Sequence, residues 1–166
     1  MNENKTNINW YPGHMAKTKR LINEQEKLID LVFELIDARI PFSSKIKEKD
    51  NILNYKPRVL ILTKYDLCDK KETDKWIKYY EEKGNKVVKL DLSKVNIDFS
   101  KVIDSANELM KNINQKRNSK GLKDKEIRAL VLGIPNVGKS TFINRFVGKS
   151  VANTGNKPGD RKSTRL

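Results

Sequence analysis

One stretch near the carboxyl end of the chain, residues 130–141, restricts the possible folds more than any other. It reads Leu-Val-Leu-Gly-Ile-Pro-Asn-Val-Gly-Lys-Ser-Thr, an apolar run that leads into the spacing Gly-x-x-x-x-Gly-Lys-Ser, and the amphipathic segment 141–147 comes next. A strand, a loop bounded by glycines and the start of a helix in this order are typical of a phosphate-binding loop (P-loop). The stretch therefore predicts an α/β domain that binds a nucleoside triphosphate. A glycine turn without a ligand is the alternative.

The residue types within this loop suit a polyphosphate ligand. Gly133 and Gly138 allow backbone N–H groups to converge on an anion, and the helix that follows adds the partial positive charge of its N-terminus. Lys139 can reach the β- and γ-phosphates, and the hydroxyl of Ser140 can bind Mg²⁺. We predict that the nucleotide contacts the seven residues Pro135, Asn136, Val137, Gly138, Lys139, Ser140 and Thr141.

The charge balance indicates a polyanionic partner. The 166 residues include 35 Lys and Arg against 21 Asp and Glu, a formal net charge of +14. An excess of this size favours association with RNA, DNA or anionic lipid, although a lysine-rich surface from an AT-rich genome would look the same.

The sequence also indicates where such a protein works. Cys68 is the one cysteine, which excludes a disulfide framework within the chain and is typical of a reducing compartment. No apolar run reaches the roughly 20 residues of a membrane span, and residues 1–9 contain no signal-peptide core. We therefore expect a cytoplasmic protein without a membrane span.

Apolar segments alternate with helical patterns along the rest of the chain. We predict strands over 31–36, 58–62, 86–92 and 127–132, and helices over 16–29, 43–54, 72–83 and 99–117. This alternation predicts βαβ units and a mostly parallel sheet. In the last helix an apolar stripe is expected to face the core: Val102, Ile103, Ala106, Leu109, Met110 and Ile113. Residues 114–125 are basic and polar, and we expect a solvated linker there.

A short polar motif, Thr63-Lys64-Tyr65-Asp66, follows the second predicted strand. Open α/β sheets place ligand contacts at the carboxyl ends of their strands. The Asp66 carboxylate can accept hydrogen bonds from N1–H and the exocyclic amine of guanine, which adenine does not offer, and the stem of Lys64 can lie along the purine. Ser93 stands at the next strand end, where a serine or a backbone amide completes a base pocket. We predict that Thr63, Lys64, Asp66 and Ser93 contact the nucleotide; a polar turn is the alternative.

The order of the two motifs is unusual. In most GTPases the P-loop precedes the base-reading Lys-x-Asp, whereas here the base-reading motif comes about seventy residues before the P-loop. Assembly of a pocket does not depend on chain order, so the chain fits a circularly permuted GTPase domain. Because permutation succeeds where termini join at the surface, the basic segment 114–125 is the expected join.

Three motifs together resemble one known family. They are Asn-Trp-Tyr-Pro-Gly-His-Met-Ala-Lys at 9–17, Asp-Ala-Arg-Ile-Pro at 37–41 and Gly-Ile-Pro-Asn-Val-Gly-Lys-Ser-Thr at 133–141. In combination they closely resemble the YlqF/RbgA family, the ribosome biogenesis GTPase A proteins. The resemblance extends from about Ile8 to Gly159, nearly the whole chain.

This resemblance implies a P-loop GTPase that binds GTP or GDP with Mg²⁺, associates with rRNA and proteins of the large ribosomal subunit and promotes a late step in its assembly. It also implies stimulation by K⁺, with Asn136 at the cation, which would add positive charge where negative charge develops during phosphoryl transfer. The family lacks the usual water-positioning glutamine. His14 is therefore the candidate catalytic residue together with Lys139, and a structural role for His14 is the alternative.

The chain departs from the family pattern after Pro158-Gly159. No Asp-x-x-Gly follows the P-loop, and Thr154, Ser163 and Thr164 are not in clear register for the switch threonine. We expect a chain truncated before the second switch motif and the C-terminal domain, with the strand 127–132 left as an exposed apolar edge. Guanine nucleotide binding with little hydrolysis is the expected result, since both switch contributions to Mg²⁺ and the γ-phosphate are absent.

We divide the chain into five parts: an N-terminal arm and helix (1–29), the first part of an incomplete, permuted GTPase domain (30–113), a basic linker (114–126), the P-loop part (127–159) and an atypical tail (160–166). Two other functions stay open at this point. One is a P-loop ATPase or kinase in which the Thr-Lys-x-Asp motif is accidental, and the other is a basic RNA-binding module with a vestigial nucleotide site.

Overall fold

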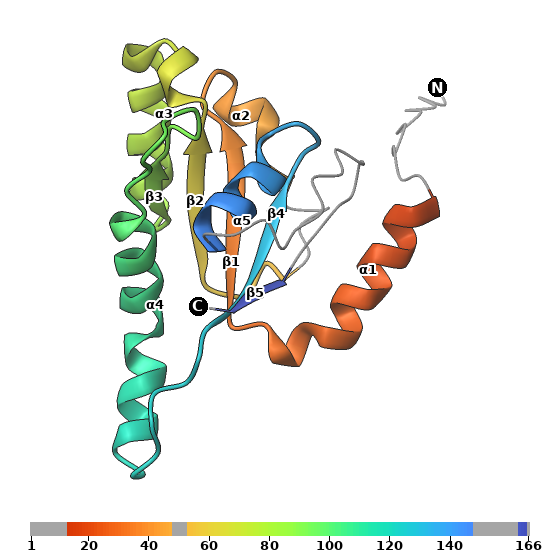
Figure 1. Ribbon diagram of the computed structural model, residues 1–166, viewed down its shortest axis with the longest axis vertical. Coiled ribbons are helices and arrows are strands. Elements are labelled where there is room, and N and C mark those ends of the chain that lie inside the picture. Colours follow the sequence, from red (N-terminus) through yellow and green to blue (C-terminus); the bar gives the residue numbers. More distant parts are fainter. Residues whose placement is uncertain (1–12, 48–52, 148–162, 166) are drawn as a thin grey trace, which may run out of the picture.

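The structure of the protein is a computed structural model that describes residues 13–47, 53–147 and 163–165. Figure 1 shows a central sheet with helices on both of its faces. This is the three-layer α/β arrangement that the alternation of strands and helices predicts.

The sheet has five strands in the order β3–β2–β1–β4–β5. Four of them run parallel: β1 (Leu31–Asp37), β2 (Arg58–Thr63), β3 (Lys86–Lys89) and β4 (Arg128–Gly133). β3 ends at Lys89, earlier than the predicted Leu92. In register, Asp37 lies opposite Thr63 and Leu35 opposite Gly133, so the carboxyl ends of β1, β2 and β4 meet at one edge of the sheet.

The strand before the P-loop has a second neighbour along its amino half, so the expectation of an exposed apolar edge over 127–132 is wrong for Arg128–Leu130. The short strand β5 (Ser163–Arg165) pairs antiparallel with β4, from Arg128 opposite Arg165 to Leu130 opposite Ser163. The amino half of β4 therefore has backbone partners on both sides. A polar strand of three residues carries no apolar alternation, which is why the pattern did not predict it.

Different helices pack against the two faces of the sheet. Residues 31, 33 and 35 of β1 lie in one apolar cluster with α4 (Ser100–Asn118) and α5 (Lys139–Val147). The alternate residues Val32 and Ile36 face α1 (Gly13–Gln25) and α3 (Lys70–Glu82) respectively. Because successive side chains of a strand point to opposite faces, β1 is buried along its whole length.

The apolar stripe of α4 covers the sheet only in part. Val102, Ala106 and Met110 are fully buried and Leu109 packs against them, as predicted. Ile103 and Ile113 are exposed, so the expectation that they face the core is wrong. The helix α4 extends beyond the end of the sheet before it ends at Asn118 (Figure 1).

The predicted helix over 43–54 is also wrong in the described part of the chain. The helix there, α2, covers only Pro41–Ser44, and Lys45 is already extended. The reason is Glu34 on β1, a fully buried carboxylate that accepts a hydrogen bond from the N–H of Ile46 at 2.9 Å and pairs with Arg58 and Lys45. Burial of a carboxylate costs free energy unless the carboxylate is paired and hydrogen-bonded. The extended conformation of this segment allows the N–H of Ile46 and the ammonium of Lys45 to reach Glu34.

The helix α3 starts and ends as ordinary capping rules require. The Asp69 carboxylate accepts hydrogen bonds from the N–H groups of Lys71 and Glu72 at the start of α3, and Gly84 follows its end at φ +85°. The helix α1 covers Gly13–Gln25, so it begins three residues before the predicted start at residue 16, and His14 lies in its first turn.

Candidate functional site

The P-loop connects β4 to α5, and its two glycines are required by its shape. A Cβ atom at Gly133 would lie 2.7 Å from Val137 Cγ1 and 3.0 Å from the carbonyl oxygen of Leu35. Gly138 has φ +107°, and a Cβ there would approach Leu92 Cδ1 to 3.1 Å. Asn136 also has a positive φ, +62°. The loop therefore doubles back tightly on itself before α5, as a cradle for an anion must.

Lys139 is the first residue of α5, and only 8% of its surface is exposed. Its Nζ donates hydrogen bonds to the carbonyl oxygens of Gly133, at 2.9 Å, and Ile134, at 2.7 Å. Ser140 and Thr141 follow in the first turn, where backbone N–H groups have no partner within the helix. A buried ammonium beside a helix N-terminus fits the phosphate groups of a nucleotide.

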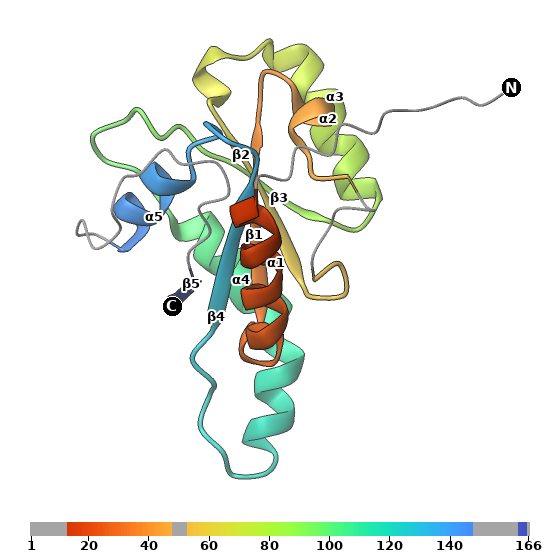
Figure 2. The same cartoon turned by 90° about the vertical axis from the view of Figure 1, so that its right-hand side faces the viewer.

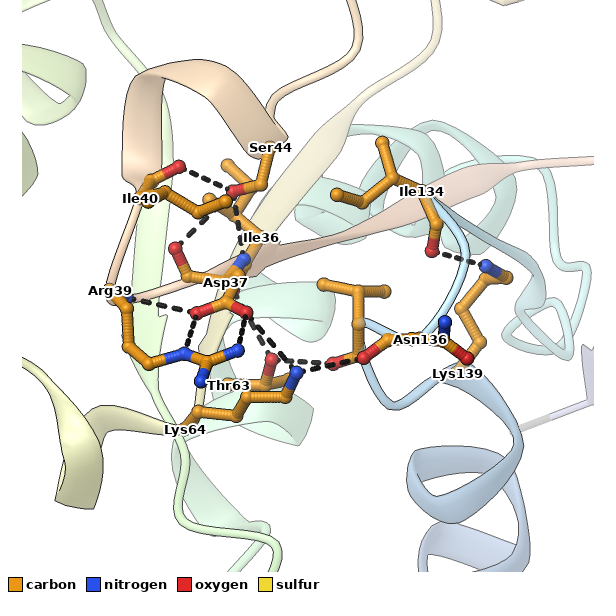
Figure 3. Close-up of polar contacts among 11 residues, drawn as sticks. Ile36, Asp37, Arg39, Ile40, Ser44, Thr63, Lys64, Ile134, Asn136 and Lys139 are labelled. Carbon is orange, nitrogen blue, oxygen red and sulfur yellow. Dashed lines mark hydrogen bonds and ion pairs between the residues drawn. The ribbon is translucent and has the colours of Figure 1, made fainter. Parts of the chain in front are cut away.

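The base-reading motif contacts the P-loop directly, although the two lie far apart in the sequence (Figure 3). Thr63, the last residue of β2, is fully buried, and its Oγ1 donates a hydrogen bond to the carbonyl oxygen of Val137 at 2.6 Å. Lys64 has the left-handed backbone conformation, and its Nζ donates to the carbonyl oxygen of Asn136 at 2.8 Å. Two neighbouring residues thus hold two neighbouring carbonyls, which joins the motifs into one site.

Asp37, at the end of β1, is a residue of this site to which the sequence pattern alone assigned no role. Its carboxylate receives hydrogen bonds from Lys64 Nζ at 3.1 Å and from Arg39 Nε and Nη2 at 3.0 and 2.8 Å (Figure 3). The Ser44 hydroxyl binds the backbone of Asp37 on its other side. Lys64 therefore bridges the Asp37 carboxylate and the P-loop, which fixes the direction of its side chain. The position of Asp37 at the end of an apolar strand was the available signal.

The Asp37 carboxyl group is held in its ionised form. Burial raises its pKa, but the hydrogen bonds from Arg39 and Lys64 outweigh burial and lower the pKa from 3.8 to about 2. Because the folded-state pKa lies below the unfolded value, the interaction stabilises the fold above pH 3.8 and is lost as the pH falls toward 2.

We expect Asp37→Asn to lower the free energy of unfolding at pH 7 by about 1–2 kcal/mol, a value reduced for the solvent around Arg39. The variant should also lose stability less steeply than the parent as the pH falls from 4 to 2. Urea denaturation across this pH range measures both effects, with Asp104→Asn, an exposed position on α4, as the control. An unchanged pH profile in the Asp37 variant would contradict the assignment.

Asp66 and Ser93 lie at the same edge of the sheet. Asp66 is exposed in the 3-10 helix Tyr65–Leu67, directly after the bridging Lys64. The hydroxyl and the N–H of Ser93 donate hydrogen bonds to Asp91, and these bonds lower the pKa of Asp91. Asp91 is therefore a further residue of this region, which no motif in the sequence indicated. Its hydrogen bonds with Ser93 orient the loop that carries Ser93.

The structure provides less information about two of the predicted site residues, His14 and Asn136. The side chain of His14 lies outside the described residues, so its catalytic role stays a prediction. Asn136 is exposed at the turn of the P-loop, and its backbone carbonyl is the one that Lys64 binds. Among the described residues no group of three or more His, Cys, Asp or Glu side chains could hold a metal ion. Ser140 lies in the first turn of α5, and its role as a ligand of Mg²⁺ stays a prediction from the P-loop spacing.

Comparison with known proteins identifies relatives of this chain. A family model described as "50S ribosome-binding GTPase" matches residues 128–165. The ribosome biogenesis GTPase A of Bacillus cereus is 43% identical over 152 residues, which cover 92% of this chain and 51% of that protein. The protein of the same name from Bacillus licheniformis is 45% identical over 153 residues, 92% of this chain and 53% of that one. The chain spans about half the length of the curated relatives it matches.

Solved structures agree with the sequence comparison. The structure described as GNP-bound YlqF from T. maritima has a TM-score of 0.56 and 29% sequence identity, over 80% of this chain and 48% of that chain. In the part of the chain that the structure describes, no helix combines the length and the apolar character of a membrane span. The motifs, the P-loop fold and the similarity over nine-tenths of its length confirm that this chain belongs to the YlqF/RbgA family, the ribosome biogenesis GTPase A proteins.

Proposed function

We propose that this chain binds GTP and GDP at the joined site and takes part in assembly of the large ribosomal subunit in the cytoplasm. The observation that carries the proposal is the double contact of Thr63 with Val137 and of Lys64 with Asn136. These contacts hold together the element that carries Asp66, for which we propose recognition of the base, and the element that carries Lys139, for which we propose binding of the phosphates. The relatives' names support the ribosomal part of the proposal.

Within this site each residue has a distinct role. Asp66 accepts hydrogen bonds from the guanine edge, the stem of Lys64 lies along the purine, and Ser93 borders the base. Residues 135–141 surround the phosphates, with Lys139 neutralising the β- and γ-phosphates and the hydroxyl of Ser140 as a ligand of Mg²⁺. Mg²⁺ and a K⁺ ion beside Asn136 would supply positive charge at the phosphoryl group, and His14 would orient the attacking water.

One experiment on the 166-residue polypeptide tests the proposal. We expect a fluorescent GDP analogue to bind and to be displaced by GTP but not by ATP. On the same sample, single-turnover hydrolysis of GTP in KCl and in NaCl should be slow, because the sequence has no Asp-x-x-Gly after Lys139 to hold Mg²⁺ near the γ-phosphate. Displacement by ATP as efficiently as by GTP would overturn guanine specificity. Fast, K⁺-dependent turnover would overturn the expectation of slow hydrolysis.

A further inference from the structure

The end of α4 and the turn after it extend beyond the sheet, at the opposite end of the molecule from the P-loop (Figures 1 and 2). The helix begins next to α5, where the rings of Phe99 and Phe146 are 5.1 Å apart. Nearer its other end, Asn114 Oδ1 accepts a hydrogen bond from the N–H of Lys125, and the Lys125 ammonium pairs with Asp30, the residue before β1 at the amino edge of the strands. We call residues 109–123 the basic prong.

All the charged side chains of the basic prong are positive, and the nearest carboxylates along the chain are Glu108 before it and Asp124 after it. It contains five basic residues and no Asp or Glu: Lys111, Lys116, Arg117, Lys120 and Lys123. The four lysines are exposed, and Arg117 is half-buried. No carboxylate forms an ion pair with any of the five among the residues that the structure describes. These charges are therefore available to a partner.

Hydrogen bonds hold the basic prong in one shape. Gly121, at φ +70°, turns the chain at the end of α4, and the N–H of Leu122 donates to the carbonyl oxygen of Arg117 at 3.1 Å. Arg117 Nε donates to the carbonyl oxygen of Lys123 at 3.1 Å, which ties the returning segment to the helix. Further back, Lys125 pairs with Asp30 and so anchors the base of the prong to the sheet.

Helix stability accounts for only part of this charge. Cations in the last turn of a helix interact favourably with its C-terminal carbonyls, which accounts for Lys116 and Arg117. The effect falls off within one turn, so it accounts neither for Lys111 nor for Lys120 and Lys123 beyond the helix. With Glu and Asp absent from residues 109–123, the cluster has the composition of a surface that meets a polyanion.

We propose that the basic prong binds the phosphate backbone of double-stranded RNA. From Lys111 to Lys120 the prong is about 14 Å long at a helical rise of 1.5 Å per residue, which is the length of roughly four phosphates on one strand. It contains no Phe, Tyr or Trp on which unpaired bases could stack, so it reads the backbone rather than the sequence. The proposal rests on the proposed ribosomal function only for the source of the RNA.

The test compares two variants of the 166-residue chain that lose the same charge. The prong variant is Lys116→Gln/Lys120→Gln/Lys123→Gln, which keeps Arg117 and the turn at Gly121. The control is Lys71→Gln/Lys78→Gln/Lys101→Gln, three exposed lysines outside the prong and the P-loop. Binding of a short, fully paired RNA duplex is measured at several KCl concentrations. Binding of a fluorescent GDP analogue is measured in parallel.

We expect the prong variant to bind the duplex at least about tenfold more weakly at 100 mM KCl, with a salt slope smaller by about 2–3. The control should change less than about threefold, and GDP affinity should be unchanged in both variants. Equal losses in the two variants, or tighter binding of the parent chain to polyglutamate or anionic vesicles than to the duplex, would overturn the proposal. Since GDP binding is measured separately, failure of the nucleotide site would be seen on its own.

Discussion

Asp66→Ala is expected to lower the affinity for GDP and GTP by about 10²- to 10³-fold and to leave the weak affinity for ADP and ATP unchanged. The carboxylate would accept two hydrogen bonds from guanine, and hydrogen bonds to a charged group contribute about 1.5–3 kcal/mol each. Lys64 positions this contact, because its ammonium is held between Asp37 and the carbonyl of Asn136. The variant should therefore lose the preference for guanine rather than all nucleotide binding.

Titration with fluorescent GDP and ADP analogues checks this result, with Asp104→Ala as the control for loss of an exposed carboxylate. Retention of a guanine preference by the Asp66 variant would mean that the Thr-Lys-x-Asp sequence is accidental. A P-loop ATPase or kinase would then fit the chain better.

Lys139→Ala should weaken binding of GDP and GTP by about 10²-fold or more, because the phosphates lose a charge-assisted partner in a site screened from water. The same change removes both hydrogen bonds to the carbonyl oxygens of Gly133 and Ile134. We therefore also expect a small loss of stability, which a thermal unfolding curve separates from the binding defect. Guanine and adenine nucleotides should be affected alike, unlike in the Asp66 variant.

Lys101→Ala, an exposed lysine at the start of α4, is the matched control, and its affinity for GDP should equal that of the parent. If Lys139→Ala bound GDP normally while it kept a native unfolding curve, the phosphates would have to lie elsewhere. A variant that still bound RNA at full strength would support the separation of the nucleotide site from the basic prong.

Local patterns predicted the parts of this structure that depend on neighbours in the sequence. The strands β1, β2 and β4 are continuous apolar runs, and the glycine spacing of the P-loop is specific to a strand, a tight turn and a helix start in that order. The segment after α2 was predicted wrongly because its conformation depends on Glu34, a buried carboxylate twelve residues away from Ile46. Ile113 is exposed because α4 outruns the sheet, which helical periodicity does not reveal.

In the candidate site, too, local features could be predicted from the sequence, whereas contacts between distant residues could not. The ligand-binding roles of both motifs could be predicted from the spacing of their residues. The contact between the motifs could not, because Thr63 and Val137 are 74 residues apart. Nor could the role of Asp37, whose meaning depends on Lys64 arriving from the neighbouring strand. Contacts between strand ends follow from register, and register is fixed only when the sheet forms.

The length of α4 has a mechanical consequence. The helix is a rod about 28 Å long at a rise of 1.5 Å per residue, with Phe99 against α5 at one end and the basic prong at the other. Its first half is clamped to the sheet by Val102, Ala106 and Met110, and its second half projects beyond the sheet. A tilt of the whole helix by about 5° about its amino end would move its far end by roughly 2.5 Å over this length. A displacement of that size at the basic prong would be large enough to make or break hydrogen bonds, whose donor–acceptor distances span only about 2.7–3.2 Å.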